Sequence, residues 1–357
     1  MKYLIIILLS LLLVCCNDMY DVPREPMWND STVTTQLLVL NEGLFNMNNS
    51  TLAHINLQTG DIDNDIFRTI NKRGLGDTGN DMRLYGSKIY IVVNISSQIE
   101  VLDAHTLQSI KQIPLFNDNG IARQPRHIAF HNDKAYVTCF DGQVAQIDTA
   151  SLAVERWTTC GRNPDNLAVC NNKLYVSNSG GLDNPFYDNS VSVISLDSFQ
   201  EIRRIAVGIN PGCIAADSEG DIYVITRGDY DEEDYLLHKI DTDIDTVVNS
   251  FSHIHPLKMI IHNDIAYMYS YNYKTNERWI RTFDCLTDQV VNDNFISDGT
   301  PIQTPFSLTI NPANGDLYVT EAYNYVIWGD LLCFNREGQL RFRLNEIGLN
   351  PNAVIIY

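Results

Sequence analysis

The chain has 357 residues, of which 45% are hydrophobic, and its formal net charge is −19 at pH 7. This acidic balance argues against nucleic-acid binding and against a polybasic membrane-surface site, because both require clusters of Lys and Arg. None of the 8 cysteines forms a Cys-x-x-Cys pair, so we expect no zinc site and no thioredoxin-like motif. We also expect no intrinsic metal or cofactor, and we expect buried thiols at the scattered cysteines.

The first residues resemble a secretory signal. Lys2 precedes an apolar run from Leu4 to Val14, which is shorter than the roughly twenty residues that span a bilayer. The following Cys15-Cys16 pair resembles a bacterial lipobox, and Cys16 is the better lipid acceptor because the residue before it is small. We expect residues 1–16 to be a lipoprotein signal peptide with a lipidated Cys16, and residues 17–34 to be a flexible tether. The alternative is an ordinary signal peptide with two incidental cysteines.

One sequence unit recurs along the rest of the chain. It has X-Pro, two residues, a short apolar run, a polar turn and an apolar strand with a Tyr, as in "QPRHIAFHNDKAYVTC" and "NPDNLAVCNNKLYVSN". The prolines of the unit, with a glycine in the first copy, stand at positions 79, 125, 164, 211, 256, 305 and 351. A period of about 40 to 50 residues with several short strands per repeat indicates a β-propeller.

The two ends of the repeat region complement each other. Residues 36–43 form a second strand that lacks a first, and the C-terminal "NPNAVIIY" is a first strand that lacks a second. We predict an all-β, seven-bladed β-propeller over residues 35–357, with four antiparallel strands per blade. The C-terminal strand completes the N-terminal blade, so that no sheet edge stays open at the seam. A pair of β-sandwiches, the alternative fold, predicts no such regular period.

Aromatic residues concentrate in the loops between the second and third strands of the blades. These loops lie on the same face as the links between blades, which we call the near face. Five of them are long, and the triplet Tyr-Asn-Tyr occurs in two, on neighbouring blades. Exposed aromatic clusters commonly mark binding sites, because Tyr and Trp combine flat apolar area with a polar edge. The expected ligand-binding residues in these loops are Phe45, Tyr187, Tyr230, Tyr271, Tyr273, Trp279, Tyr323, Tyr325 and Trp328. The alternative is that some rings only cover the blade ends.

Polar residues just after the blade links are expected to line the mouth of the central channel on the same face. Arg126, His127 and Asn166 are the predicted ligand contacts there, with Asp165 and Lys258 beside them. Alternatively, these side chains only solvate the channel. The sequence has no G-x-S-x-G, no H-E-x-x-H and no phosphate-binding glycine loop, so we do not expect an enzyme. Acid–base lyase chemistry at the near-face acids and His127 is the alternative.

The repeat unit resembles that of the YncE-like seven-bladed propellers over the whole chain after the tether. The segments "VLNEGLF", "NSGGLDN" and "TRGDYDEEDYLLHKID" are similar to lipoprotein members from gut Bacteroidota. That group includes surface corrinoid-binding propellers, which capture vitamin B12 and pass it to an outer-membrane transporter. The resemblance implies a lipid-anchored protein of the outer membrane, at the cell surface, with a corrinoid (cobalamin) as bound ligand and a transporter as partner. A glycan-binding lipoprotein, and a docking or scaffold protein, are the alternative hypotheses.

Overall fold

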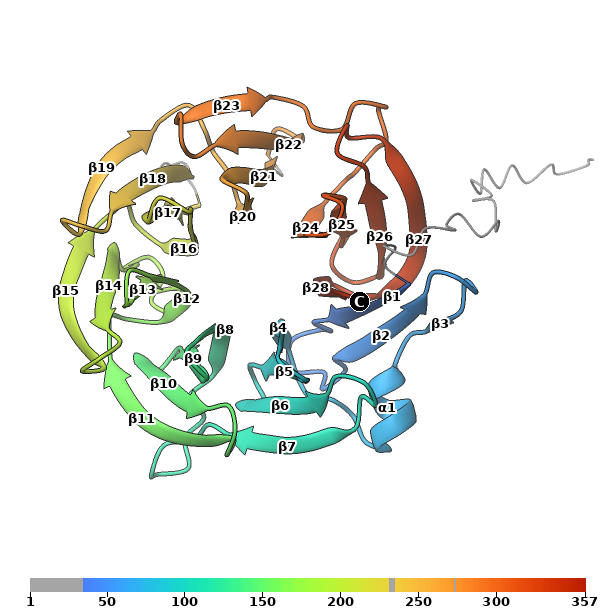
Figure 1. The fold of residues 1–357 in the computed structure, drawn as a ribbon, viewed down its shortest axis with the longest axis horizontal. Coiled ribbons are helices and arrows are strands. Elements are labelled where there is room, and N and C mark those ends of the chain that lie inside the picture. Colours follow the sequence, from blue (N-terminus) through green and yellow to red (C-terminus); the bar gives the residue numbers. More distant parts are fainter. Residues whose placement is uncertain (1–34, 231–234, 273) are drawn as a thin grey trace, which may run out of the picture.

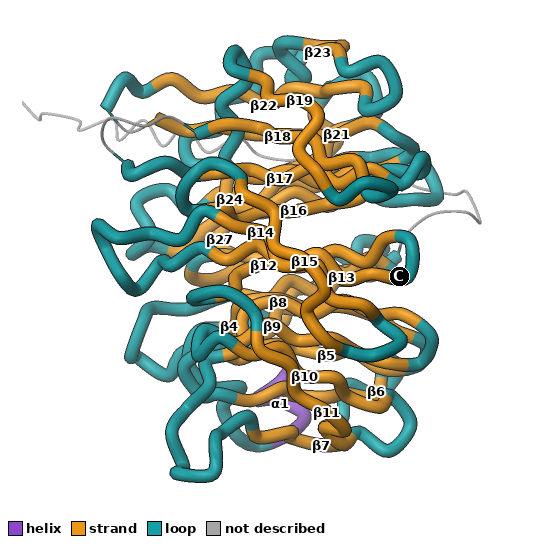
Figure 2. Tube along the Cα trace, turned by 90° about the vertical axis from the view of Figure 1, so that its left-hand side faces the viewer, coloured by secondary structure: helices purple, strands orange, loops and turns teal. Residues whose placement is uncertain are grey.

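Seven four-stranded antiparallel sheets surround a central axis in the computed structural model, which describes residues 35–230, 235–272 and 274–357 (Figure 1). The predicted seven-bladed β-propeller is therefore confirmed. Seen from the side, the strands cross the thickness of the ring and the loops gather on its two faces (Figure 2). The expected signal peptide, Cys16 and the tether lie outside the described residues. Within the described residues, no helix has the length and apolarity needed to cross a membrane.

In each blade the four strands lie side by side, from an inner strand at the axis to an outer strand at the rim (Figure 1). We number the blades from the N-terminus. From inside to outside the strands are β28 (Pro351–Ile356), β1 (Gln36–Asn41), β2 (Thr51–Asn56) and β3 (Ile62–Asp63) in blade 1; β4 (Gly79–Tyr85), β5 (Lys88–Val93), β6 (Gln98–Asp103) and β7 (Ser109–Pro114) in blade 2; β8 (Pro125–His131), β9 (Lys134–Cys139), β10 (Gln143–Asp148) and β11 (Ala153–Thr159) in blade 3; β12 (Pro164–Cys170), β13 (Lys173–Asn178), β14 (Ser190–Ser195) and β15 (Gln200–Ala206) in blade 4; β16 (Pro211–Ala216), β17 (Asp221–Thr226), β18 (Leu236–Asp241) and β19 (Thr246–Phe251) in blade 5; β20 (Lys258–His262), β21 (Ile265–Asn272), β22 (Glu277–Asp284) and β23 (Gln289–Asn292) in blade 6; and β24 (Pro305–Ile310), β25 (Leu317–Glu321), β26 (Trp328–Phe334) and β27 (Leu340–Leu349) in blade 7.

The ring closes in blade 1, where the last strand of the chain pairs with the first. Strand β28 is antiparallel to β1, with Val354 opposite Val39. Beyond the strand, Gln36 and Tyr357 exchange two backbone hydrogen bonds of 2.9 and 3.0 Å. The backbone groups of both strands are thereby paired, which removes the open edge that either strand would have on its own. The predicted closure is confirmed.

The recurring Tyr of the sequence unit joins neighbouring blades. Tyr90, Tyr175 and Tyr223 are fully buried in the second strands of blades 2, 4 and 5. The hydroxyl of Tyr223 donates to the carbonyl of Cys285 in blade 6 at 2.8 Å, and the hydroxyl of Tyr175 donates to Asp245 in blade 5 at 2.5 Å. A buried Tyr needs a partner for its hydroxyl, and here that partner belongs to the next blade. In these blades the Tyr of the repeat unit therefore supplies a contact with the next blade.

The cysteines of the ring are buried and free. Cys139, Cys160, Cys170, Cys213, Cys285 and Cys333 form no disulfide. Burial raises the pKa of the Cys285 thiol to about 12, and it raises the pKa of the Cys333 thiol to about 12. These thiols are therefore protonated at neutral pH and behave as small apolar side chains. The sequence expectation of buried thiols is confirmed.

Two features differ from the sequence prediction. Tyr271 and Trp279 were expected in a loop, but β21 continues to Asn272 and β22 begins at Glu277, so that Tyr271 lies opposite Arg278 in a strand pair. Aromatic residues favour strands, which explains the extension. The short helix α1 (Ile66–Asn71) was not predicted. It follows the two-residue strand β3, and it buries Phe67 beside blade 1.

Removal of the closing strand tests the importance of the seam. We expect deletion of residues 350–357 to lower the thermal unfolding temperature of the whole ring, because β1 loses its partner and its buried side chains become exposed. The matched control is Tyr357→Ser, which keeps all backbone hydrogen bonds of the seam. An unchanged unfolding temperature of the truncated chain in scanning calorimetry would contradict this account.

Candidate functional site

A cavity of about 820 Å³ opens on the near face where the loops and links of blades 5, 6 and 7 meet. We call it the tyrosine pocket. Its lining consists of Tyr235, Leu257, Tyr271, Asn276, Arg278, Gln303, Thr304, Tyr323, Asn324, Tyr325 and Ile327. The two Tyr-Asn-Tyr segments of the sequence thus contribute to the same cavity, through Tyr271 on one side and through Tyr323 and Tyr325 on the other. Tyr273 lies outside the described residues.

Two of the pocket tyrosines have hydroxyl groups without a hydrogen-bond partner among the described residues. The hydroxyls of Tyr271 and Tyr325 form no hydrogen bond with another described residue. The Tyr325 ring packs edge-on against Phe306 at 5.9 Å between ring centroids, and the Arg278 guanidinium lies 5.7 Å from the centroid of the Tyr271 ring. These contacts hold both rings in place at the pocket wall, and no described residue occupies their hydroxyls.

The hydroxyl of Tyr323, unlike the other two, forms hydrogen bonds with described residues of the protein. It donates to Asp330 at 2.5 Å and accepts from the Arg343 guanidinium at 2.7 Å. Burial raises the pKa of Tyr323 to about 12. The backbone φ angles of Tyr323 and Tyr325 are 50° and 66°, a region that bulky side chains rarely adopt. Such backbone strain persists only where surrounding contacts enforce it, and it is frequent in binding loops.

A row of aromatic rings continues from the pocket to blade 4. Tyr235 lies 6.3 Å from Tyr230, and Tyr230 lies 5.9 Å from Tyr187, in both cases edge to face and measured between ring centroids. The structure therefore brings together Tyr187, Tyr230, Tyr271, Tyr323 and Tyr325 of the predicted site. They form a band of rings along one side of the near face.

Three other predicted aromatic residues stay outside this band of rings. Phe45 is 68% exposed in the loop after β1, and Trp328 is 47% exposed at the start of β26. Trp279 lies on β22 and packs against the core between blades 5 and 6, with the Arg281 guanidinium 4.3 Å from its ring centroid. Because side chains alternate along a strand, Trp279 points away from the side that Arg278 presents to the pocket.

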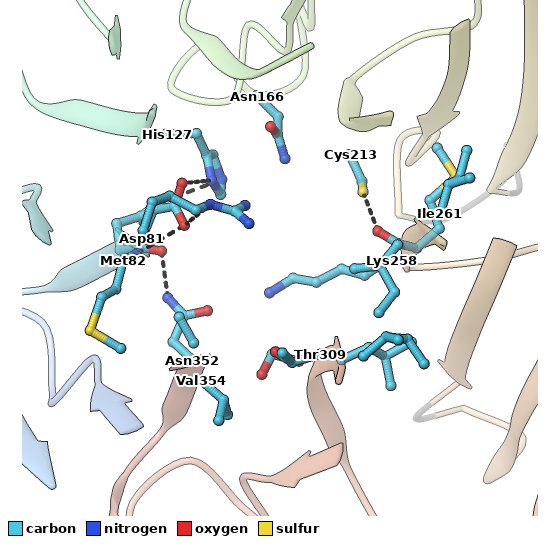
Figure 3. A pocket seen from close by; sticks show the side chains of 18 of the residues that line it. Asp81, Met82, His127, Asn166, Cys213, Lys258, Ile261, Thr309, Asn352 and Val354 are labelled. Atoms are coloured by element: carbon cyan, nitrogen blue, oxygen red, sulfur yellow. Dashed lines mark hydrogen bonds and ion pairs between the residues drawn. The ribbon is translucent and has the colours of Figure 1, made fainter. Parts of the chain in front are cut away.

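A second cavity, of about 310 Å³, lies in the central channel between the inner strands (Figure 3). His127 and Asn166 line it, as predicted, together with Lys258. Arg126 instead supports the wall. Its Nε donates to Asp165 at 3.0 Å, and its guanidinium lies 4.5 Å from the Phe140 ring centroid.

Asp165 is the centre of a charged network between blades. Its side chain is 1% exposed and pairs with Arg126 of blade 3 at 3.0 Å and with Arg227 of blade 5 at 2.6 Å. Burial alone would raise the pKa of Asp165, but Arg126 and Arg227 outweigh burial and hold it well below the usual range. Asp81 is similar: burial opposes its ionisation, but Arg83 and His127 lower its pKa. Both carboxylates are therefore ionised at neutral pH.

Several residues of the channel were not predicted from the sequence, among them Asn80, Asp81, Asn352 and Arg227. Asn80 and Asp81 follow the anchor at position 79, and Asn352 follows the anchor at position 351, in the places that Arg126 and His127 occupy in blade 3. An alignment of the repeats would have identified these three residues. Arg227 follows β17, and nothing in the repeat marks its contact with Asp165.

Neutralising Asp165 tests the network. We expect Asp165→Asn to lower the free energy of unfolding by about 3 kcal/mol at pH 7, because Arg126 and Arg227 lose their common counter-charge. Since the folded-state pKa of Asp165 is depressed, its contribution is present at neutral pH and declines as the pH falls below about 4. Chemical denaturation at several pH values should show the deficit shrinking in acid. The exposed Asp118→Asn is the control, and a deficit independent of pH would refute the linkage.

Comparisons with known proteins agree with this fold. A family model described as "Domain of unknown function (DUF5074)" matches residues 36–332. No curated protein matches the chain. Solved structures of similar fold include a quinoprotein alcohol dehydrogenase-like protein from Bacteroides thetaiotaomicron, at 16% identity and a TM-score of 0.65 over 90% of this chain and 78% of that one. Another is the dihydro-heme d1 dehydrogenase NirN in complex with DHE, at 12% identity and a TM-score of 0.58 over 94% and 78% of the two chains. These likenesses are of fold alone, whereas the family match covers most of the chain, which therefore belongs to the DUF5074 family.

Proposed function

We propose that this protein is a binding propeller whose tyrosine pocket captures a corrinoid, most simply cobalamin. The observation that carries the proposal is the convergence of Tyr235, Tyr271 and Tyr325, from three successive blades, on one cavity of about 820 Å³. Ligand pockets for small molecules typically enclose roughly 300–1,000 Å³. A cavity of this size suits part of a large ring-shaped ligand whose remainder rests on the neighbouring aromatic row.

The pocket lining fits the chemistry of a corrinoid. A corrinoid has an apolar macrocycle edge and several amide side chains. Tyrosine rings supply flat apolar contact area, and the hydroxyls of Tyr271 and Tyr325 can exchange hydrogen bonds with amides. The pocket also contains the amides of Asn276, Gln303 and Asn324 as further donors and acceptors.

We further propose that the protein is lipid-anchored through Cys16 at the outer membrane, at the cell surface, and delivers its ligand to an outer-membrane transporter. The resemblance to surface corrinoid-binding propellers of gut Bacteroidota supports this role. Exposed apolar side chains at Phe45, Val326 and Trp328, from 47% to 68% exposed, supply near-face surface that a protein partner could cover.

A glycan is the second candidate ligand, because exposed tyrosine rings also serve as stacking platforms for sugars. A lyase is less well supported. The channel carboxylates Asp81 and Asp165 are each bound to an arginine, and a carboxylate held in its ionised form by arginine is a weak base.

Titration with cyanocobalamin tests the proposal. A chain beginning after Cys16 keeps every residue of the ring, and we expect it to bind cyanocobalamin with measurable heat in calorimetry. Tyr271→Ala and Tyr325→Ala should each weaken binding by about tenfold or more, since each removes a ring from the pocket wall. We avoid Tyr323→Ala as the main test because that hydroxyl belongs to the network with Asp330 and Arg343.

The control is Tyr357→Ala, which removes a partly exposed tyrosine outside the pocket. Absence of heat, together with an unchanged melting temperature at excess cyanocobalamin, would remove the corrinoid proposal and make glycans the next ligands to test. Binding that is insensitive to both pocket substitutions would place the corrinoid elsewhere on the protein.

The lipid anchor has a separate test. We expect the full chain expressed in a Bacteroidota host to incorporate labelled palmitate, and Cys16→Ala to abolish the incorporation, whereas Cys15→Ala should retain it. Labelling of the Cys16→Ala chain would show that the anchor is attached elsewhere.

A further inference from the structure

Lys258 is a channel lysine that forms no ion pair with a carboxylate of the described residues. It begins β20, and its side chain extends into the middle of the channel (Figure 3). Its Nζ donates to the carbonyl of Phe306 at 3.0 Å and lies 4.8 Å from the centroid of that ring. Across the described residues it forms no ion pair. An ammonium group in a confined cavity is costly unless an opposite charge accompanies it.

The carboxylates nearest to the channel wall are already engaged. Asp81 pairs with Arg83 at 3.1 Å and with His127 at 3.3 Å. Asp165, as described above, is held between two arginines. Glu42 attracts Lys258 electrostatically, but burial raises the pKa of Glu42 and no ion pair joins the two in the described part of the chain. Arg83 and Arg227 of the cavity lining therefore have carboxylate partners, whereas Lys258 forms no ion pair with a described residue.

Asn166 supplies a second donor to the same cavity. Its Oδ1 accepts a hydrogen bond from the backbone N–H of Leu167 at 2.8 Å. Because only the oxygen can accept that bond, the orientation of the amide is fixed and its NH₂ group faces the channel (Figure 3). This NH₂ group donates to none of the described residues. Two polar groups thus point into one cavity from blades 4 and 6, each with N–H donors that bind none of the described residues.

We propose that the central channel binds a small oxyanion, a carboxylate or inorganic phosphate, between the ammonium of Lys258 and the amide of Asn166. Such an anion would place a negative charge next to Lys258, and its oxygens would accept hydrogen bonds from the Lys258 ammonium and from the Asn166 NH₂ group. The cavity of about 310 Å³ has room for an anion of this size. Burial lowers the pKa of Lys258, and a bound anion would offset this effect. The channel site is separate from the tyrosine pocket and does not depend on the corrinoid proposal.

Calorimetric titration with inorganic phosphate and with succinate tests this site, with ionic strength held constant by sodium chloride. The chain beginning after Cys16 is expected to bind at least one of these anions at a single site, and the one that binds identifies phosphate or carboxylate as the preferred class. Lys258→Met should weaken binding by about tenfold or more, because a charge-assisted hydrogen bond is lost. Lys258→Arg keeps the charge and should retain most of the affinity.

Asn166→Asp gives an independent test. The aspartate can still accept from Leu167, but it presents a carboxylate oxygen where the NH₂ group was, so anion binding should be lost by electrostatic repulsion. Glu42→Gln should retain or strengthen binding. Lys111→Met, on the outer strand β7, is the control and should leave affinity unchanged. The proposal is overturned if neither anion binds the wild-type chain, or if Lys258→Met and Asn166→Asp, with unfolding transitions like that of the wild type, bind as tightly as the wild type does.

Discussion

The pairing of β1 with β28 is the constraint on which the whole structure depends. It joins segments at opposite ends of the chain, with Leu37 opposite Ile356. Each blade buries its faces against two neighbours, so an open ring would expose two sheet faces as well as two strand edges. The channel and the tyrosine pocket both exist because closure fixes the angle between successive blades. Neither cavity is formed by one blade alone.

Polar contacts between blades fix the relative position of the blades, which apolar packing alone leaves less defined. The buried Tyr hydroxyls and the two arginines around Asp165 each join a blade to another one at a defined atom. Two apolar surfaces can slide over each other at little cost. A buried carboxylate instead requires that its hydrogen-bond and ion-pair partners stay in place. The polar groups of the channel are therefore held in fixed orientations before any ligand arrives, and this lowers the entropic cost of binding.

Much of the fold was predictable because each blade repeats one local pattern. The anchors from Gly79 to Pro351 locate every inner strand, and the incomplete units at the two ends predicted the seam. The grouping of Tyr271 with Tyr325 followed from equal loop positions on neighbouring blades. Contacts that depend on three-dimensional placement were not predictable. Arg227 reaches Asp165 across 62 positions of sequence, and nothing local distinguishes Tyr323, whose hydroxyl is bound to Asp330, from Tyr325, whose ring packs against Phe306.

The burial of the free cysteines has a consequence for how the ring opens. No covalent cross-link joins the blades in the described part of the chain, so each blade can separate from its neighbours without breaking a bond. Cys139, Cys285 and Cys333 lie in blades 3, 6 and 7, and each is at most 1% exposed in the closed ring. A thiol can react only during a local opening of its own surroundings. The order in which the cysteines are modified therefore follows the order in which the blades around them open.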